Sequence, residues 1–123
     1  MAKEFAEKRK APRFSLESFS DFKNENGELE KDCYIQNIGT GGVMAMSILK
    51  HSVGDKIKIS FKIKDRVFEK DGIVKTSKPL SSNRKHVLKI GKNLNFANSL
   101  NIAFNEELSL ADFDYIKFNY LKD

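Results

Sequence analysis

Residues 57–64 read IKISFKIK, a stretch in which each apolar residue is followed by a polar one. Successive side chains of a β-strand point to opposite faces, so this alternation is typical of an antiparallel strand with one face on a core and the other in solvent. Residues 100–104, LNIAF, alternate in the same way. These two stretches predict a fold built on an antiparallel sheet.

Weaker strand candidates lie on both sides of residues 57–64, at 13–16, 33–38, 43–47, 67–76 and 86–90. The segments between them carry turn residues: NENG at 24–27, GTGG at 39–42 and VGD at 53–55. Short strands with frequent turn signals favour an all-β barrel or sandwich.

The period changes to that of a helix at residues 109–121. Ser109 is placed as the N-cap, and Asp112 stands where the acid of a capping box belongs. The apolar residues expected to face the sheet are Leu110, Phe113, Ile116 (or Lys117), Tyr120 and Leu121. We therefore predict a β-barrel closed by one C-terminal amphipathic helix.

Composition excludes several classes of protein. The chain has 123 residues, the size of one domain, and no apolar run near the roughly 20 residues that span a bilayer. Its N-terminus lacks the pattern of a secretory signal, and its one cysteine, Cys33, expected to be a packed side chain, cannot form an internal disulfide. With only His51 and His86, both expected at the surface, no metal-ligand spacing or nucleophile-base pattern is visible. We expect a soluble, cytoplasmic protein that is not an enzyme and needs no metal or cofactor.

The net charge of +5 is concentrated in two segments. Residues 1–13 carry five bases and two acids, and residues 75–93 carry six bases and no acid, whereas 14–33 and 105–123 are acidic. Such blocks suggest an anionic partner that touches the N-terminal segment. For residues 75–93 two interpretations stay open, contact with the same anionic partner and a set of solvated lysines. Of 22 basic residues only four are arginine, and two of them, Arg9 and Arg13, lie four residues apart. The planar fork of arginine holds phosphate or a guanine edge by two parallel hydrogen bonds, which lysine cannot do.

A second notable stretch is YIQNIGTGGV at residues 34–43, a strand that enters and leaves a turn rich in glycine. Glycine permits positive φ and close approach of the backbone to a ligand, and the Asn37 amide both donates and accepts hydrogen bonds. Taken alone, the stretch is also explained by a plain hairpin turn.

Arg9-x-x-x-Arg13 followed by Asn37-x-Gly39-x-x-Gly42 resembles the PilZ family, whose signature is RxxxR and then [D/N]xSxxG. The resemblance covers roughly residues 7–121. It implies a six-stranded antiparallel barrel that binds the bacterial second messenger cyclic di-GMP. In the family the two arginines lie on a flexible N-terminal arm and grip phosphate and guanine. Those roles fall on Arg9 and Arg13, guanine contact falls on Asn37, and the closing glycine of the motif is Gly42.

One position departs from the family pattern, because Gly39 replaces the usual serine and its hydroxyl. A lost hydrogen bond costs about 0.5–1.5 kcal/mol, so we expect binding weakened by up to about tenfold. Thr40 is a candidate source of a replacement hydroxyl. Lys8 is a candidate for holding a second, stacked ligand molecule, or is simply a solvated lysine.

The resemblance thus predicts a flexible basic arm at 1–13 and a PilZ barrel with its helix at 14–123. It implies a receptor or adaptor that changes conformation on binding cyclic di-GMP and signals through an unidentified protein effector, with motility and biofilm formation as the outputs that the family implies. The main alternative is a PilZ-like adaptor that does not bind cyclic di-GMP and acts only by protein contacts. A barrel for single-stranded nucleic acid is a third interpretation, prompted by a pI near 9.3 and ten Phe residues, although most of those are needed for the core, so no DNA or RNA partner is expected.

Overall fold

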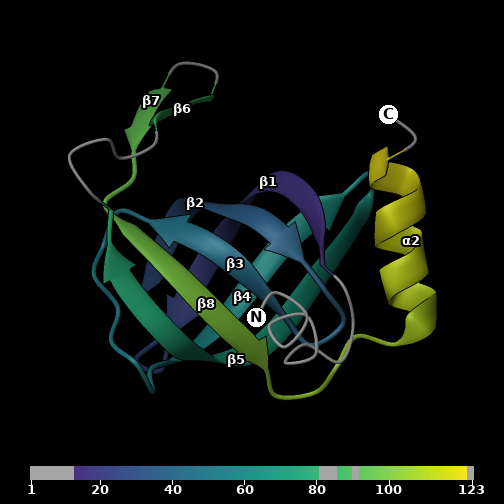
Figure 1. The fold of residues 1–123 in the computed structure, drawn as a ribbon, viewed down its shortest axis with the longest axis horizontal. Helices are drawn as coiled ribbons and strands as arrows, with labels where there is room; N and C mark the ends of the chain where they lie inside the picture. The colour runs from purple at the N-terminus through teal and green to yellow at the C-terminus, as the bar shows by residue number, and fades with distance from the viewer. Residues whose placement is uncertain (1–12, 81–85, 90–91, 122–123) are drawn as a thin grey trace, which may run out of the picture.

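The structure is a computed structural model that describes residues 13–80, 86–89 and 92–121. The elements in chain order are β1 (Phe14–Asn24), β2 (Leu29–Ile38), β3 (Gly42–Ser47), β4 (Lys56–Ile63), β5 (Arg66–Pro79), β6 (His86–Lys89), β7 (Lys92–Asn95), β8 (Asn98–Phe104) and α2 (Leu110–Leu121). Six strands close into an antiparallel barrel in the order β1-β2-β3-β8-β5-β4 (Figure 1). The expected six-stranded barrel with a C-terminal helix is therefore confirmed.

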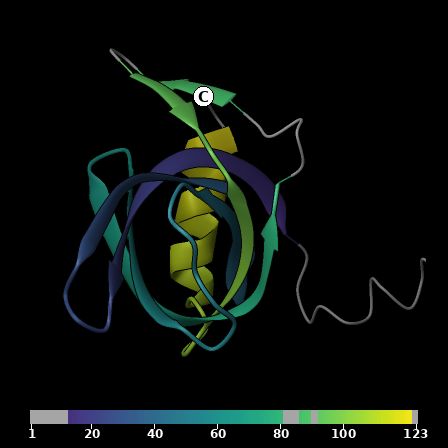
Figure 2. The same cartoon turned by 90° about the vertical axis from the view of Figure 1, so that its left-hand side faces the viewer.

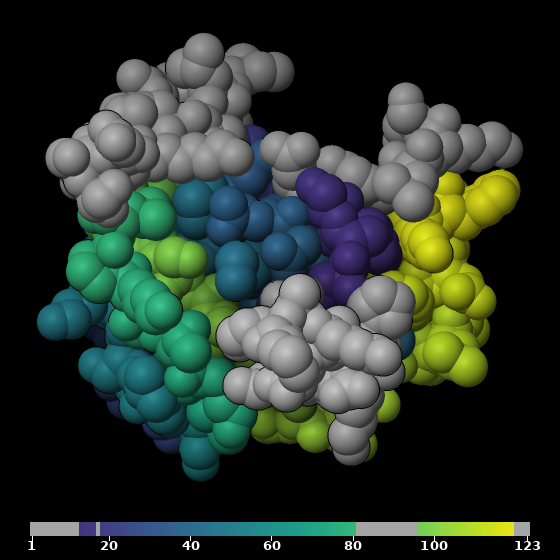
Figure 3. Space-filling view, in the orientation of Figure 1, coloured from purple at the N-terminus to yellow at the C-terminus, as the bar shows by residue number. Residues whose placement is uncertain are grey.

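The helix α2 lies across one end of the barrel, as Figure 2 shows in a view into the opposite end. Phe14 at the start of β1 packs edge-on against Phe113 of α2, with ring centroids 5.5 Å apart, and the two segments adjoin in Figure 3. Ile116 is fully buried. We call this the helix end. The opposite end carries the β1–β2 turn and the loop between β3 and β4.

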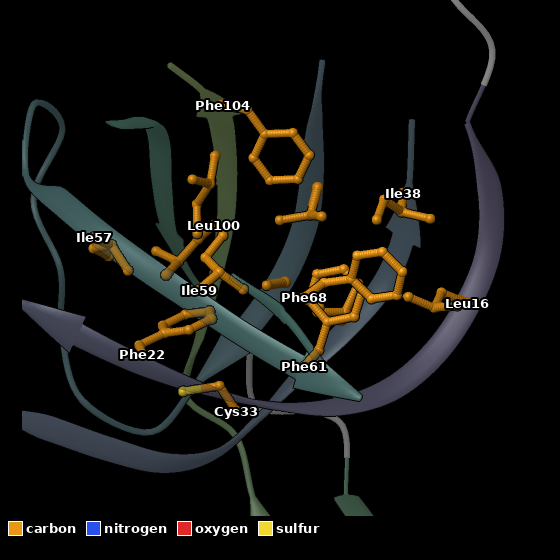
Figure 4. Packing of buried hydrophobic residues seen from close by; sticks show 14 of the residues in the cluster. Leu16, Phe22, Cys33, Ile38, Ile57, Ile59, Phe61, Phe68, Leu100 and Phe104 are labelled. Carbon is orange, nitrogen blue, oxygen red and sulfur yellow. The ribbon is translucent and has the colours of Figure 1, made fainter. Parts of the chain in front are cut away.

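The barrel interior is filled by the apolar side chains that point inward from the barrel strands (Figure 4). Ile57, Ile59, Phe61 and Ile63 of the alternating stretch are all buried, whereas the lysines between them are exposed. Cys33 is also buried in this core, as expected. The alternation of apolar and polar residues in β4 thus reflects one face of the strand that is buried in the core and one that is exposed to solvent.

Two expectations about the helix need correction. Leu110 is 74% exposed and does not face the sheet, and the half-buried Tyr115 packs there instead. Ser109 caps the helix through the N–H of Asp112, but the Asp112 carboxylate accepts a hydrogen bond from Arg66 at 2.6 Å. Arg66 therefore links α2 to the start of β5.

Several strands differ from their expected bounds. Strands β1 and β2 are longer than the short candidates at 13–16 and 33–38. Their full length was not evident from the sequence because a β-bulge near Asp32, whose φ is +63°, interrupts the alternation of apolar and polar residues. The candidate at 86–90 is a strand, β6, but it pairs only with β7 in a two-stranded sheet separate from the barrel order. This hairpin projects beside the barrel in Figure 1.

Candidate functional site

Arg13, the last residue before β1, brings the two sequence motifs together. Its Nη1 lies 3.5 Å from Oδ1 of Asn37, and its Nη2 donates a hydrogen bond of 3.0 Å to Oδ1 of Asn101. These partners are 24 and 88 residues away along the chain. The guanidinium therefore lies over the outer face of β2, β3 and β8, near the helix end.

The register of the barrel explains why the two asparagines share this face. Asn37 pairs with Met44 of β3, Met44 pairs with Asn101 of β8, and Asn101 pairs with Thr76 of β5. Directly paired residues have side chains on the same side of a sheet. Asn37, Met44, Asn101 and Thr76 thus form one row across four strands, which we call the outer row.

A β-bulge flanks the outer row on each side. On β2 the register shifts between Ile35 and Asn37, and on β5 it shifts between Val74 and Thr76. A bulge inserts one extra residue, here Gln36 and Lys75, and re-aims the side chains beside it. The inserted residue lets Ile35 and Ile38 stay in the core while Asn37 faces outward.

The turn at 39–42 is held tightly by backbone hydrogen bonds. The Gly39 N–H donates to the Gly42 carbonyl at 2.9 Å, and the carbonyls of Thr40 and Gly41 accept from Leu108 and Phe104 at 2.8 Å each. Thr40 is buried, with 8% of its surface exposed. The turn is therefore fastened to the segment that leads into α2.

Gly42 has a structural role that the sequence motif did not reveal. A Cβ added there would lie 2.3 Å from the carbonyl oxygen of Ile102 on the neighbouring strand β8. Neither Gly41 nor Gly42 has a positive φ, in contrast to Gly27 and Gly54. The close approach that requires glycine at position 42 is thus between two strands of the barrel.

Of the other site residues predicted from the sequence, the structure places two in the turn beside Asn37 and does not describe two more. Gly39 and Thr40 belong to the turn beside Asn37, whereas Lys8 and Arg9 lie outside the described residues. Asn101 was not singled out from the sequence, although its position between Leu100 and Ile102 marks it as outward-facing in an alternating strand. Its approach to Arg13 depends on the register of β3 with β8, which no local pattern encodes.

A second polar cluster lies near the opposite end of the barrel. Glu30 Oε1 lies 2.8 Å from His51 Nε2, and Glu30 Oε2 accepts hydrogen bonds of 3.1 Å from the N–H groups of Ile48 and Leu49. Burial acts to raise the pKa of Glu30, but the hydrogen bonds from His51 and the two amides outweigh it and hold that pKa below its usual value. The expectation of a surface His51 was wrong, since its side chain is only 12% exposed. This cluster fastens the β3–β4 loop to β2.

Neither Cys33 nor the opposite end offers a clear reactive centre. Burial, and then the nearby Glu30 carboxylate, raise the pKa of the Cys33 thiol, so the thiol stays protonated.

An open pocket of about 430 Å³ is lined by Asn24, Glu25, Asn26, Leu49, Lys50, His51, Asp55, Lys56 and Ile57. Within the described ranges, no three His, Cys, Asp or Glu side chains are grouped to hold a metal ion. No helix in those ranges is long and apolar enough to cross a membrane.

Comparison with known proteins gives a match through structure alone. No protein-family model matches the sequence, and no curated protein matches it. The structure is similar to that of the PilZ domain of YcgR from Escherichia coli with cyclic di-GMP, with a TM-score of 0.62 and 14% sequence identity. The match covers 93% of this chain and 89% of that chain. The closed barrel, the capping helix and this match together show that the chain has a PilZ-like fold.

Proposed function

We propose that the chain binds cyclic di-GMP on the outer face of its barrel and acts as an adaptor toward a protein partner, not as an enzyme. The observation that carries the proposal is the position of Arg13, whose guanidinium lies against Asn37 and Asn101. The PilZ-like fold supports it, because the similar YcgR domain is described with cyclic di-GMP. We place this activity in the bacterial cytoplasm, with motility and biofilm formation as the outputs that the family resemblance implies.

The chemistry of this face suits a ligand with two guanines and two phosphates. A guanidinium that bonds to neutral amide oxygens can exchange them for a phosphate or a guanine edge and gain stronger, charge-assisted hydrogen bonds. Between Asn37 and Asn101 lies the half-buried Met44, and beside the row lie Ala103 and Ile73. These side chains offer an apolar surface for a base, while the amides address its edge. Arg9 and Lys8 complete the proposed site from the N-terminal segment.

The turn supplies a route from this face to the rest of the molecule. Thr40 and Gly41 bind the backbone at Leu108 and Phe104, just before α2. Arg13 is followed directly by Phe14, which packs on Phe113 of the same helix. We propose that a ligand that displaces Arg13 or the turn also shifts α2, which would present a changed surface to the partner.

Gly39 is expected to limit the affinity. Because Thr40 is buried and its carbonyl is already bonded to Leu108, we do not expect its hydroxyl to replace the missing serine. The variant Gly39→Ser should therefore bind cyclic di-GMP more tightly, by up to about tenfold, since it adds one hydrogen-bonding group worth about 0.5–1.5 kcal/mol. Unchanged binding by Gly39→Ser would show that a hydroxyl at this position does not contact the ligand, and weaker binding would show that the added side chain hinders the ligand.

The direct test is isothermal titration calorimetry with cyclic di-GMP on the wild type and on Arg13→Ala, Arg13→Lys and Asn37→Ala. Loss of a charged hydrogen bond costs about 1.5–3 kcal/mol, so Arg13→Ala should bind at least about tenfold more weakly. Arg13→Lys keeps the charge but loses the fork, and should recover little. Lys62→Ala, an exposed lysine of β4, serves as the matched control.

The ligand needs a control as well. Cyclic di-AMP has the same two phosphates with adenine in place of guanine, so weaker binding of cyclic di-AMP would indicate recognition of the guanine edge. No heat from the wild type with cyclic di-GMP, or equal heat from the wild type and Arg13→Ala, would overturn the proposal. Only the absence of heat would favour the alternative, an adaptor with a PilZ-like fold that works by protein contacts alone, whereas equal heat would show that the ligand binds without Arg13.

A further inference from the structure

Strand β5 places two exposed lysines beside the outer row. Lys75 and Lys78 are both exposed, and both belong to the acid-free basic segment at 75–93. The sequence left that segment open between an anion site and a solvated surface. Its first residues, 75–79, lie in strand β5 of the barrel, where residues 76–79 pair with β8 and Lys75 is the bulged residue before them.

The register brings these lysines next to the residues that contact Arg13. Thr76 pairs with Asn101, and the bulged residue Lys75 is the second β5 residue opposite that asparagine. Lys78 pairs with Ser99, the next outward-facing residue along β8. Adjacent strands lie about 4.8 Å apart, so the backbone of Lys75 is one strand spacing from that of Asn101. Arg13 thus bonds to the Asn101 side chain, and Lys75 lies on the strand next to Asn101, on the side away from β3.

These two cations have no ionic partner in the part of the chain that the structure describes. Neither lysine takes part in the ion pairs that join His51 to Glu30 and Arg66 to Asp112. Two unpaired positive charges next to a hydrogen-bonding row leave a local positive potential that attracts an anion.

We infer that Lys75 and Lys78 form a second cationic wall of the cyclic di-GMP site, on the side of Asn101 away from Arg13. This inference rests on the proposed function. A ligand held at one phosphate by Arg13 then extends along the outer row, and its second phosphate comes within reach of the two ammonium groups. The bulge at Lys75 is the feature that turns an extra side chain toward this row.

The test is calorimetry with cyclic di-GMP on Lys75→Ala, Lys78→Ala and the double variant, with Lys62→Ala as control. Exposed ion pairs are worth up to about 1 kcal/mol, so each single variant should bind roughly two- to fivefold more weakly and the double variant roughly tenfold. The measurements are repeated at low and high salt, because the contribution of exposed charges falls with ionic strength. The double variant should therefore show a weaker salt dependence than the wild type.

The controls separate this inference from the proposed function. Thermal unfolding of each variant checks that the fold is kept, and Lys75→Gln replaces Lys75→Ala if the shorter side chain disturbs the bulge. If the wild type binds and binding needs Arg13, but the double variant matches Lys62→Ala in affinity and salt dependence, the inference is wrong and the proposed function stands. If the wild type does not bind cyclic di-GMP at all, both fail.

Discussion

Replacement of Gly42 by alanine should damage the barrel whether or not the protein binds a ligand. The added Cβ would lie 2.3 Å from the Ile102 carbonyl oxygen and 3.2 Å from Cα of Ala103. Both obstacles are backbone atoms of β8, so no side-chain rotation relieves the overlap. The β3–β8 pair must separate near Gly42, which pairs with Ala103.

The size of the effect follows from what this separation breaks. About two backbone hydrogen bonds at roughly 1 kcal/mol each would be lost or distorted. Val43 and Ile102, which are fully buried and paired next to the overlap, would lose part of their packing, which costs about 1–2 kcal/mol more. We expect Gly42→Ala to lower the free energy of unfolding by about 2–4 kcal/mol, a loss that core overlaps commonly cause.

Gly41→Ala is the matched control for this variant. A Cβ at Gly41 has the Glu107 Oε2 atom at 3.8 Å as its nearest neighbour, an ordinary contact, and its φ is not positive. That variant should be neutral or more stable by up to about 1 kcal/mol, because alanine restricts the unfolded chain. Chemical denaturation of both variants and the wild type measures the difference. Equal midpoints for Gly42→Ala and Gly41→Ala would refute the assignment of Gly42 to barrel packing.

Three further predictions concern stability. The pKa of Glu30 is lower in the folded chain than its usual value of about 4.3. The stability that this carboxylate contributes should therefore be present above that pH and lost as the pH falls through the folded pKa. In urea unfolding from pH 7 to pH 3, Glu30→Gln should be less stable than the wild type at pH 7, and the difference should close in acid. Asp32 has a φ of +63°, so Asp32→Val should be about 1–2 kcal/mol less stable than Asp32→Gly in the same assay, although both delete the carboxylate. Arg66 bonds to Asp112 and lies over the rings of Phe68 and Tyr115 at 4.8 and 5.0 Å, so Arg66→Ala should lower thermal stability by about 1 kcal/mol, and Arg66→Lys should restore less than half of it because lysine lacks the planar fork; full rescue by lysine would mean that charge alone holds the helix.

Much of the fold could be predicted because its signals are local. Alternation in residues 57–64 identifies β4, and a change of period identifies α2. The strand order β1-β2-β3-β8-β5-β4 depends on pairings between distant segments and was not predicted, and only the family resemblance pointed to a closed barrel of six strands. The prediction of which α2 residues are buried was partly wrong at Leu110, which precedes the turn of helix that meets the barrel. The period of the apolar residues does not show where along the helix that contact begins.

The site was harder to predict than the fold for the same reason. Arg13 and Asn37 were brought together by the family motif, since nothing in a gap of 24 residues tells which strand faces will meet. Asn101 looks like any exposed polar residue of an alternating strand, and Lys75 looks like any surface lysine. Their importance depends on the register of β8 with its two neighbours.

Gly42 and Arg13 belong to the same motif pair but carry different kinds of evidence. The barrel needs Gly42 for the approach of β3 to β8, so a chain with this fold would keep that glycine even after losing its ligand. Arg13 lies on the outer face, half-buried, and it bonds there to the amides of Asn37 and Asn101, which lie outside the hydrophobic core. A variant at position 42 therefore tests the fold, whereas a variant at position 13 tests the function. The presence of the arginine, more than that of the glycine turn, is the reason to expect that this barrel binds an anionic nucleotide.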